Sequence, residues 1–214
     1  MTDFRTYQRN LPHWRLKGAI YFVTFRLADS IPKALLDRWR GERDAWFAAH
    51  GLDPTLTPAE WKRRYEAIPE PIRAGFERQQ ASKFFVELDL HHGRCELRHP
   101  EVADMVGGAL RFFDGSRLQC GDYVVMPNHV HWLVKPLGDE DLEKLLQSIK
   151  RFSAGRINEL LSRSGPLWQK ESYDHVVRDA EELARIRKYI ADNPARASMK
   201  SGEYAYYEGS LFDP

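Results

Sequence analysis

Cysteine is scarce in this chain of 214 residues, which contains only Cys95 and Cys120. Two thiols exclude a disulfide framework and a zinc site built from four thiolates, so any metal must be held by His, carboxylate or amide groups. Long apolar runs are also missing, because no stretch approaches the roughly 20 residues that cross a bilayer. Residues 1–10 carry no apolar stretch typical of a signal peptide. We therefore expect a cytoplasmic protein with no membrane partner.

Net charge is nearly absent, since 32 Lys and Arg residues face 31 Asp and Glu residues, which leaves +1. This total hides a segregation of charge, because basic residues dominate residues 4–28, 144–170 and 183–200. A polyanionic partner responds to the local field rather than to the sum. For any one stretch taken alone, a solvated helix face is an equally good explanation.

The order of elements predicts the fold class. We expect strands at residues 19–27, 118–126, 129–134 and 173–178, and helices at residues 100–113 and 142–161, with a last helix from Asp179 to Pro194. This order predicts an α+β fold, with one antiparallel sheet flanked by helices rather than a doubly wound parallel sheet. We expect a single domain over residues 1–214, with a helical insertion at about 31–90 after the first strand and a short tail at about 199–214.

The insertion carries its own helical signals. Thr57 and Glu60, with Pro58 between them, have the form of a capping box. Three of the six Trp residues lie in the insertion, and we interpret them as its local core rather than as a binding platform. They are Trp39, Trp46 and Trp61.

The sharpest chemical feature is the pair His129 and His131. On a strand, residues i and i+2 share a face, so the two imidazoles point the same way and can converge on one ion. As a bare pattern this is weak evidence, because two histidines on the solvated face of a sheet would look the same.

A second feature lies on the last helix, where Tyr189 and Asn193 are four residues apart and so share one stripe. Tyr189 is expected to flank the apolar stripe of this helix rather than to fill the core. A half-buried tyrosine that bonds a nearby backbone carbonyl is the structural alternative.

Taken together, these pieces resemble a known family. Residues 127–134 (PNHVHWLV), 168–171 (WQKE) and 188–197 (KYIADNPARA) are similar to motifs of the REP-associated tyrosine transposases, which are single-domain relatives of the HUH transposases. Residues 21–25 (YFVTF) resemble the first strand of that family, and residues 7–9 (YQR) resemble a variant of its basic amino-terminal segment. The resemblance covers about residues 5–28 and 100–198.

The resemblance implies a ferredoxin-like sheet and a metal-dependent single-stranded DNA endonuclease and strand-transferase that acts on hairpin-forming REP-like repeats. It implies Tyr189 as the nucleophile that forms a 5′-phosphotyrosine, with His129, His131 and Asn193 as ligands of a divalent metal, Mg²⁺ or Mn²⁺. The ion would neutralise charge on the phosphate, which a phenol of pKa about 10 needs at neutral pH. Tyr173 is the rival nucleophile.

The expected partner is single-stranded or hairpin DNA near the nucleoid, bound by a monomer or weak dimer. The candidate DNA-binding residues are Arg5, Arg9, Arg15, Lys17, Arg26, Lys150, Arg151, Arg156, Lys170 and Arg178. Two other functions stay open at this point. One is a DNA-binding protein without chemistry, and the other is a zinc hydrolase that uses the two histidines and a carboxylate.

Overall fold

The computed structural model describes residues 18–211. These residues form two compact units, one made of residues 31–89 and one made of residues 18–30 and 90–211. The first unit coincides with the helical insertion expected at about 31–90. Over the described residues, no helix is long and apolar enough to span a membrane.

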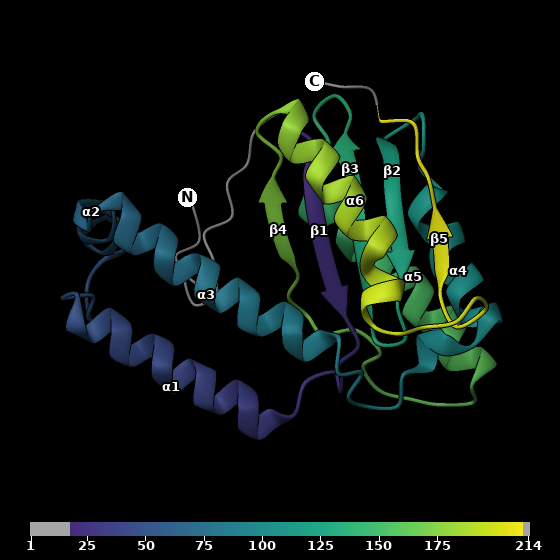
Figure 1. Ribbon diagram of the computed structural model, residues 1–214, viewed down its shortest axis with the longest axis horizontal. Helices are drawn as coiled ribbons and strands as arrows, with labels where there is room; N and C mark the ends of the chain where they lie inside the picture. Colours follow the sequence, from purple (N-terminus) through teal and green to yellow (C-terminus); the bar gives the residue numbers. More distant parts are fainter. Residues whose placement is uncertain (1–17, 212–214) are drawn as a thin grey trace. The chain divides into compact units, whose positions relative to one another are not determined.

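The larger unit is built on a five-stranded antiparallel sheet (Figure 1). Its strands are β1 (Tyr21–Arg26), β2 (Leu118–Val125), β3 (His129–Pro136), β4 (Tyr173–Val176) and β5 (Ala205–Tyr207). They lie in the order β4-β1-β3-β2-β5, and every neighbouring pair is antiparallel. The α+β prediction is therefore confirmed. The short strand β5 is an addition that we did not predict from the sequence.

Helices cover both faces of this sheet. In Figure 1, α4 (Pro100–Arg111) and α5 (Leu142–Leu160) lie behind the strands, and α6 (Ala180–Arg196) lies in front of them. Val23 and Phe25 on β1 join Val130 and Trp132 on β3 in the main apolar core. Because side chains alternate along a strand, the residues between them face α6. This alternation directs the two histidines of β3 away from the core.

The last helix runs further than expected. Asp179 caps its start by accepting a hydrogen bond from the Glu182 backbone N–H at 2.7 Å, as the sequence predicts. We expected Pro194 to end the helix, but α6 continues to Arg196. Proline removes only its own N–H, and the Ala197 N–H still reaches the Asn193 carbonyl at 3.1 Å.

The smaller unit contains α1 (Lys33–Ala49), α2 (Pro58–Ala67) and α3 (Glu70–Leu88). The Thr57 and Glu60 capping box is present at the start of α2, as expected. Trp61 is buried in a small cluster against which Trp46 packs. The expectation of a local core is confirmed for these two residues, whereas Trp39 is half-buried and outside the cluster.

The chain leaves the sheet unit after β1 and returns to it at almost the same point. The Arg94 backbone N–H donates to the Asp29 carboxylate at 3.1 Å. Gly93 has a φ of +86°, and a Cβ there would lie 2.6 Å from the Asp29 carbonyl oxygen. Only glycine fits this approach, which brings the two ends of the insertion together.

Candidate active site

The two histidines of β3 converge as expected. The His129 and His131 Nε2 atoms are 3.1 Å apart, and both residues are completely buried. Burial lowers the pKa of His131 to about 3, with a smaller effect from the positive charge of Arg196. Burial, with smaller effects from His131 and His91, also holds the pKa of His129 well below its usual value. Both imidazoles are therefore neutral at pH 7 and can offer lone pairs.

A neighbouring side chain contacts the Nδ1 atom of each imidazole. The Asn128 amide donates to the His92 carbonyl at 3.2 Å, so its oxygen faces His129 and accepts from the Nδ1–H at 2.8 Å. The lone pair of His129 is then on Nε2. Thr24 lies beside His131, with its hydroxyl 2.7 Å from Nδ1. A hydroxyl can donate or accept, so Thr24 is compatible with either tautomer of His131.

Tyr189 lies on α6, the helix that covers this face of the sheet, and contacts His131. Its hydroxyl lies 3.3 Å from His131 Nε2, and its ring lies edge-on to the His131 ring with centroids 5.1 Å apart. Phe22 packs against both rings. Tyr173 lies on the same face of the sheet, edge-on to Phe22 with centroids 6.3 Å apart. Tyr189 therefore contacts the histidine pair directly, through His131.

The donor set is compatible with a divalent metal. His129 presents an Nε2 lone pair to the His131 Nε2 atom 3.1 Å away, a position that suits either an Nε2–H of His131 or a cation between the two nitrogens. Asn193 is completely buried on α6, and neither its oxygen nor its nitrogen has a hydrogen-bond partner within residues 18–211. A buried amide without partners costs about 1–3 kcal/mol, which an ion bound to its oxygen would offset. His129, His131 and Asn193 thus fit as ligands.

Two of the candidate DNA-binding residues have a different role in the structure. Arg26 is buried and donates to the Ser30 hydroxyl at 3.0 Å, and burial lowers its pKa to about 10 against the opposing effect of Glu171. Lys150 is also buried, and its ammonium donates to the carbonyls of residues 169, 170 and 171 at 3.1–3.3 Å. Both cations hold backbone in place and are not available to phosphate, so we withdraw them from the DNA-binding set.

The remaining bases divide into two groups. Arg151, Arg156, Lys170 and Arg178 are exposed, and Arg156 forms an ion pair with Glu159 at 3.2 Å. They can reach a polyanion, and their role stays a prediction. Arg5, Arg9, Arg15 and Lys17 lie outside the described residues.

Two supporting residues were not predicted as part of the site. Thr24 is a polar residue in the otherwise apolar strand YFVTF, which is a signal that a side chain there has a partner. Its pairing opposite His131 follows from the β1–β3 register, which the sequence alone does not give. Asn128 directly precedes His129, and its amide orients the ring of its neighbour.

Comparison with known proteins supports the resemblance drawn from the motifs. Residues 111–193 match the family described as "Transposase IS200 like". The matched segment contains both histidines, Tyr189 and Asn193, and it excludes the helical insertion. Over this segment the chain is similar to the IS200-like transposases.

Three individual proteins that resemble this chain have low sequence identity to it. An uncharacterized protein of Haemophilus influenzae is 27% identical over 104 residues, which cover 39% of this chain and 57% of that protein. This chain therefore spans a little over half the length of that curated relative. A REP-associated tyrosine transposase bound to a REP hairpin is 15% identical, with a TM-score of 0.45, and the match covers 87% of this chain and 72% of that chain. A proposed transposase from Deinococcus radiodurans is 14% identical, with a TM-score of 0.38, and the match covers 86% of this chain and 96% of that chain.

Proposed function

We propose that this protein is a metal-dependent single-stranded DNA endonuclease and strand-transferase that uses Tyr189 as its nucleophile. One observation carries the proposal: the Tyr189 hydroxyl lies 3.3 Å from an imidazole nitrogen that is itself 3.1 Å from a second imidazole nitrogen. The match of this segment to the IS200-like transposases supports the same reaction. We further propose that the DNA is a hairpin-forming, REP-like repeat.

In the proposed reaction, the Tyr189 oxygen attacks the phosphorus of a DNA phosphodiester. The new bond from this oxygen to phosphorus replaces the bond from phosphorus to O3′. The proton lost by the phenol balances the proton gained by the O3′ oxygen, so the products are a 5′-phosphotyrosine and a free 3′-hydroxyl. The energy of the phosphodiester stays in the covalent link, so strand transfer needs no nucleotide cofactor.

His129, His131 and Asn193 are the proposed ligands of Mg²⁺ or Mn²⁺. When bound, the ion would neutralise charge on the phosphate oxygens and align the phosphorus for attack. Two imidazoles and an amide are softer donors than the all-oxygen set that Mg²⁺ prefers, so we expect Mn²⁺ to bind more tightly. Asn128 and Thr24 orient the two rings toward the shared point.

The rival functions are less well supported. A zinc hydrolase needs a third His, Cys or carboxylate beside the pair, and residues 18–211 contain no cluster of three such groups. A DNA-binding protein without chemistry would have no need for a tyrosine hydroxyl against two buried neutral imidazoles. The cellular setting that we propose is the cytoplasm near the nucleoid, with a monomer or weak dimer as the active form.

The test is a covalent trapping experiment. The protein is incubated with end-labelled single-stranded hairpin DNA and Mn²⁺, and a denaturing gel is used to look for a protein–DNA adduct. We expect an adduct with the wild-type protein and with Tyr173→Phe, and none with Tyr189→Phe, which removes one oxygen and little packing area. An adduct in Tyr189→Phe that Tyr173→Phe abolishes would reassign the nucleophile, and no adduct with the wild-type protein would refute the proposed function.

A further inference from the structure

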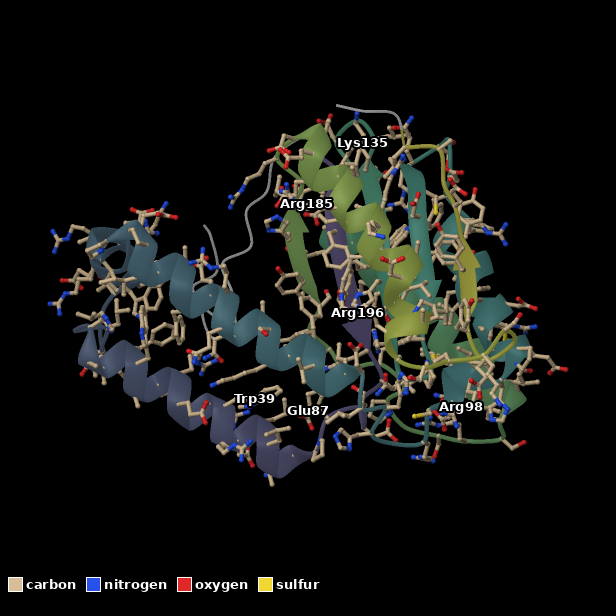
Figure 2. The ribbon with its side chains drawn as sticks, in the orientation of Figure 1. Trp39, Glu87, Arg98, Lys135, Arg185 and Arg196 are labelled. Carbon is tan, nitrogen blue, oxygen red and sulfur yellow. The ribbon has the colours of Figure 1, made fainter. Side chains whose placement is uncertain are left out.

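The bases of α6 are not equivalent. Arg185 pairs with Glu181 at 2.8 Å and Lys188 pairs with Asp192 at 2.9 Å. Arg187 donates to the Leu211 carbonyl at 2.6 Å. Within the part of the chain that the structure describes, Arg196 makes no ion pair and no hydrogen bond through its guanidinium. Figure 2 shows Arg185 near the start of the helix and Arg196 near its end.

Arg196 lies beside the proposed nucleophile. Its guanidinium carbon is 5.3 Å from the centroid of the Tyr189 ring. The hydroxyl of the same tyrosine lies 3.3 Å from His131 Nε2, which places Arg196 on the ring that contacts the histidine pair. The guanidinium is exposed, so its N–H donors can turn from the ring toward a ligand. The proposed nucleophile Tyr189 therefore lies between the His131 imidazole and the Arg196 guanidinium, and contacts both.

We propose that Arg196 binds the phosphodiester that Tyr189 attacks, and is a catalytic residue of this site. The inference rests on the proposed function and names a residue outside the metal-binding and nucleophilic groups. An attacked phosphorus must come close to the Tyr189 oxygen, which brings its non-bridging oxygens within reach of a side chain packed on the same ring. A guanidinium offers a planar fork of donors that matches two phosphate oxygens.

The role is electrostatic. Arg196 keeps its protons throughout, and donates hydrogen bonds to oxygens on which charge grows as the new bond forms. The proposed metal ligands are all neutral, so no protein carboxylate among them opposes the negative phosphate. Arg196 adds a fixed positive charge that does not depend on the ion.

This role differs from a structural one in its effect on the metal. A cation packed on the Tyr189 ring repels a divalent ion bound at the neighbouring histidine pair, so it weakens metal binding in the absence of DNA while it strengthens phosphate binding. A purely structural Arg196, which caps the helix end or covers the Tyr189 ring, would have the opposite signature. Its loss would disturb the tyrosine and the ligand helix together, and metal affinity would fall along with activity.

The experiment compares Arg196→Gln and Arg196→Lys with Arg185→Gln, a matched control on the same helix whose charge Glu181 neutralises. Three quantities are measured: the single-turnover rate of adduct formation at saturating hairpin DNA and Mn²⁺, the Mn²⁺ affinity without DNA by calorimetry, and the salt dependence of hairpin binding by fluorescence anisotropy.

For Arg196→Gln we expect adduct formation to slow by roughly 10²-fold, the size of effect seen when one oxyanion donor is removed. We expect Mn²⁺ affinity to be unchanged or higher, and the slope of log K against log salt to fall by roughly 0.7, one phosphate contact. Arg196→Lys should lie between Arg196→Gln and the wild-type protein, and Arg185→Gln should match the wild-type protein in all three quantities.

The proposal is overturned if Arg196→Gln forms the adduct at the wild-type rate, or if its Mn²⁺ affinity falls in parallel with its rate. A wild-type protein that forms no adduct would refute the proposed function instead. In that case the anisotropy measurement still decides on Arg196, because equal hairpin affinity and equal salt slope in Arg196→Gln and Arg185→Gln would exclude it as a phosphate contact.

Discussion

Two buried neutral histidines make the stability of the metal-free protein depend on pH. In the unfolded chain a histidine has a pKa near 6.5, whereas the folded protein holds the pKa of His131 at about 3 and that of His129 well below 6.5. Between these values the unfolded state binds more protons than the folded state, so the free energy of unfolding rises with pH. The stability is fully present above about pH 6.5 and is lost as the pH falls below it.

The magnitude follows from the same values. At pH 5 an unfolded histidine gains about 2 kcal/mol from protonation that a folded histidine with a pKa near 3 does not gain. His131 alone should therefore cost about 2 kcal/mol between pH 7 and pH 5, a large share of the 5–15 kcal/mol that is typical of a folded domain. The lowered pKa of His129 adds a further cost of the same sign.

The assay is urea denaturation in EDTA at pH 7, 6 and 5, followed by circular dichroism. We expect the pH dependence of the free energy of unfolding to be smaller in His131→Gln and unchanged in His99→Gln, where the replaced histidine is exposed. The quantity compared is the change with pH, so a uniformly less stable variant remains informative.

A flat stability profile between pH 7 and pH 5 would refute the reasoning, as would a profile in His131→Gln equal to that of the wild-type protein. If His131→Gln does not fold, titration of the imidazole proton signals of the wild-type protein by NMR answers the same question. Two resonances that titrate near pH 6.5 would show that the pair is accessible and charged.

Three further predictions concern the residues around the site. Thr24→Val removes the hydroxyl partner of His131 and should lower Mn²⁺ affinity by about 10–100-fold in calorimetry, whereas Thr24→Ser should stay near the wild-type value. Lys150→Met should lower the free energy of unfolding by about 1–3 kcal/mol in urea, because it leaves backbone carbonyls without their donor, and should leave the salt slope of DNA binding unchanged; a changed slope would return Lys150 to the DNA-binding set. Arg151→Gln and Arg156→Gln should each reduce that slope by roughly 0.7 if they contact phosphate, and a slope equal to the wild-type slope in both variants would show that this face of α5 only contacts solvent.

The sequence was informative where local pattern decides the outcome. Alternation along β3 was enough to direct both histidines to one face, and the four-residue spacing was enough to place Tyr189 and Asn193 on one stripe of α6. Residue chemistry at a helix start was equally reliable, since the cap at Asp179 formed as expected.

Contacts between residues far apart in the sequence could not be predicted. The partnership of Thr24 with His131 joins residues 107 positions apart, and it depends on the register of two strands that no local pattern specifies. Lys150 was misjudged for a related reason, because a base on a helix surface and a base under a loop are indistinguishable until the loop is placed. Strand β5 has only three residues, too short for alternation to show.

The approach of Arg94 to Asp29 bears on how this chain can be edited. A single hydrogen bond joins Asp29, which precedes the helical unit, to Arg94, which follows it, so we expect a short loop to be able to replace residues 31–89. The entropy lost in closing such a junction is small, since the cost depends on the distance between the joined ends and only weakly on the length removed. We therefore expect the helical unit to be modular, so that its removal or exchange would keep the strand order and the histidine pair.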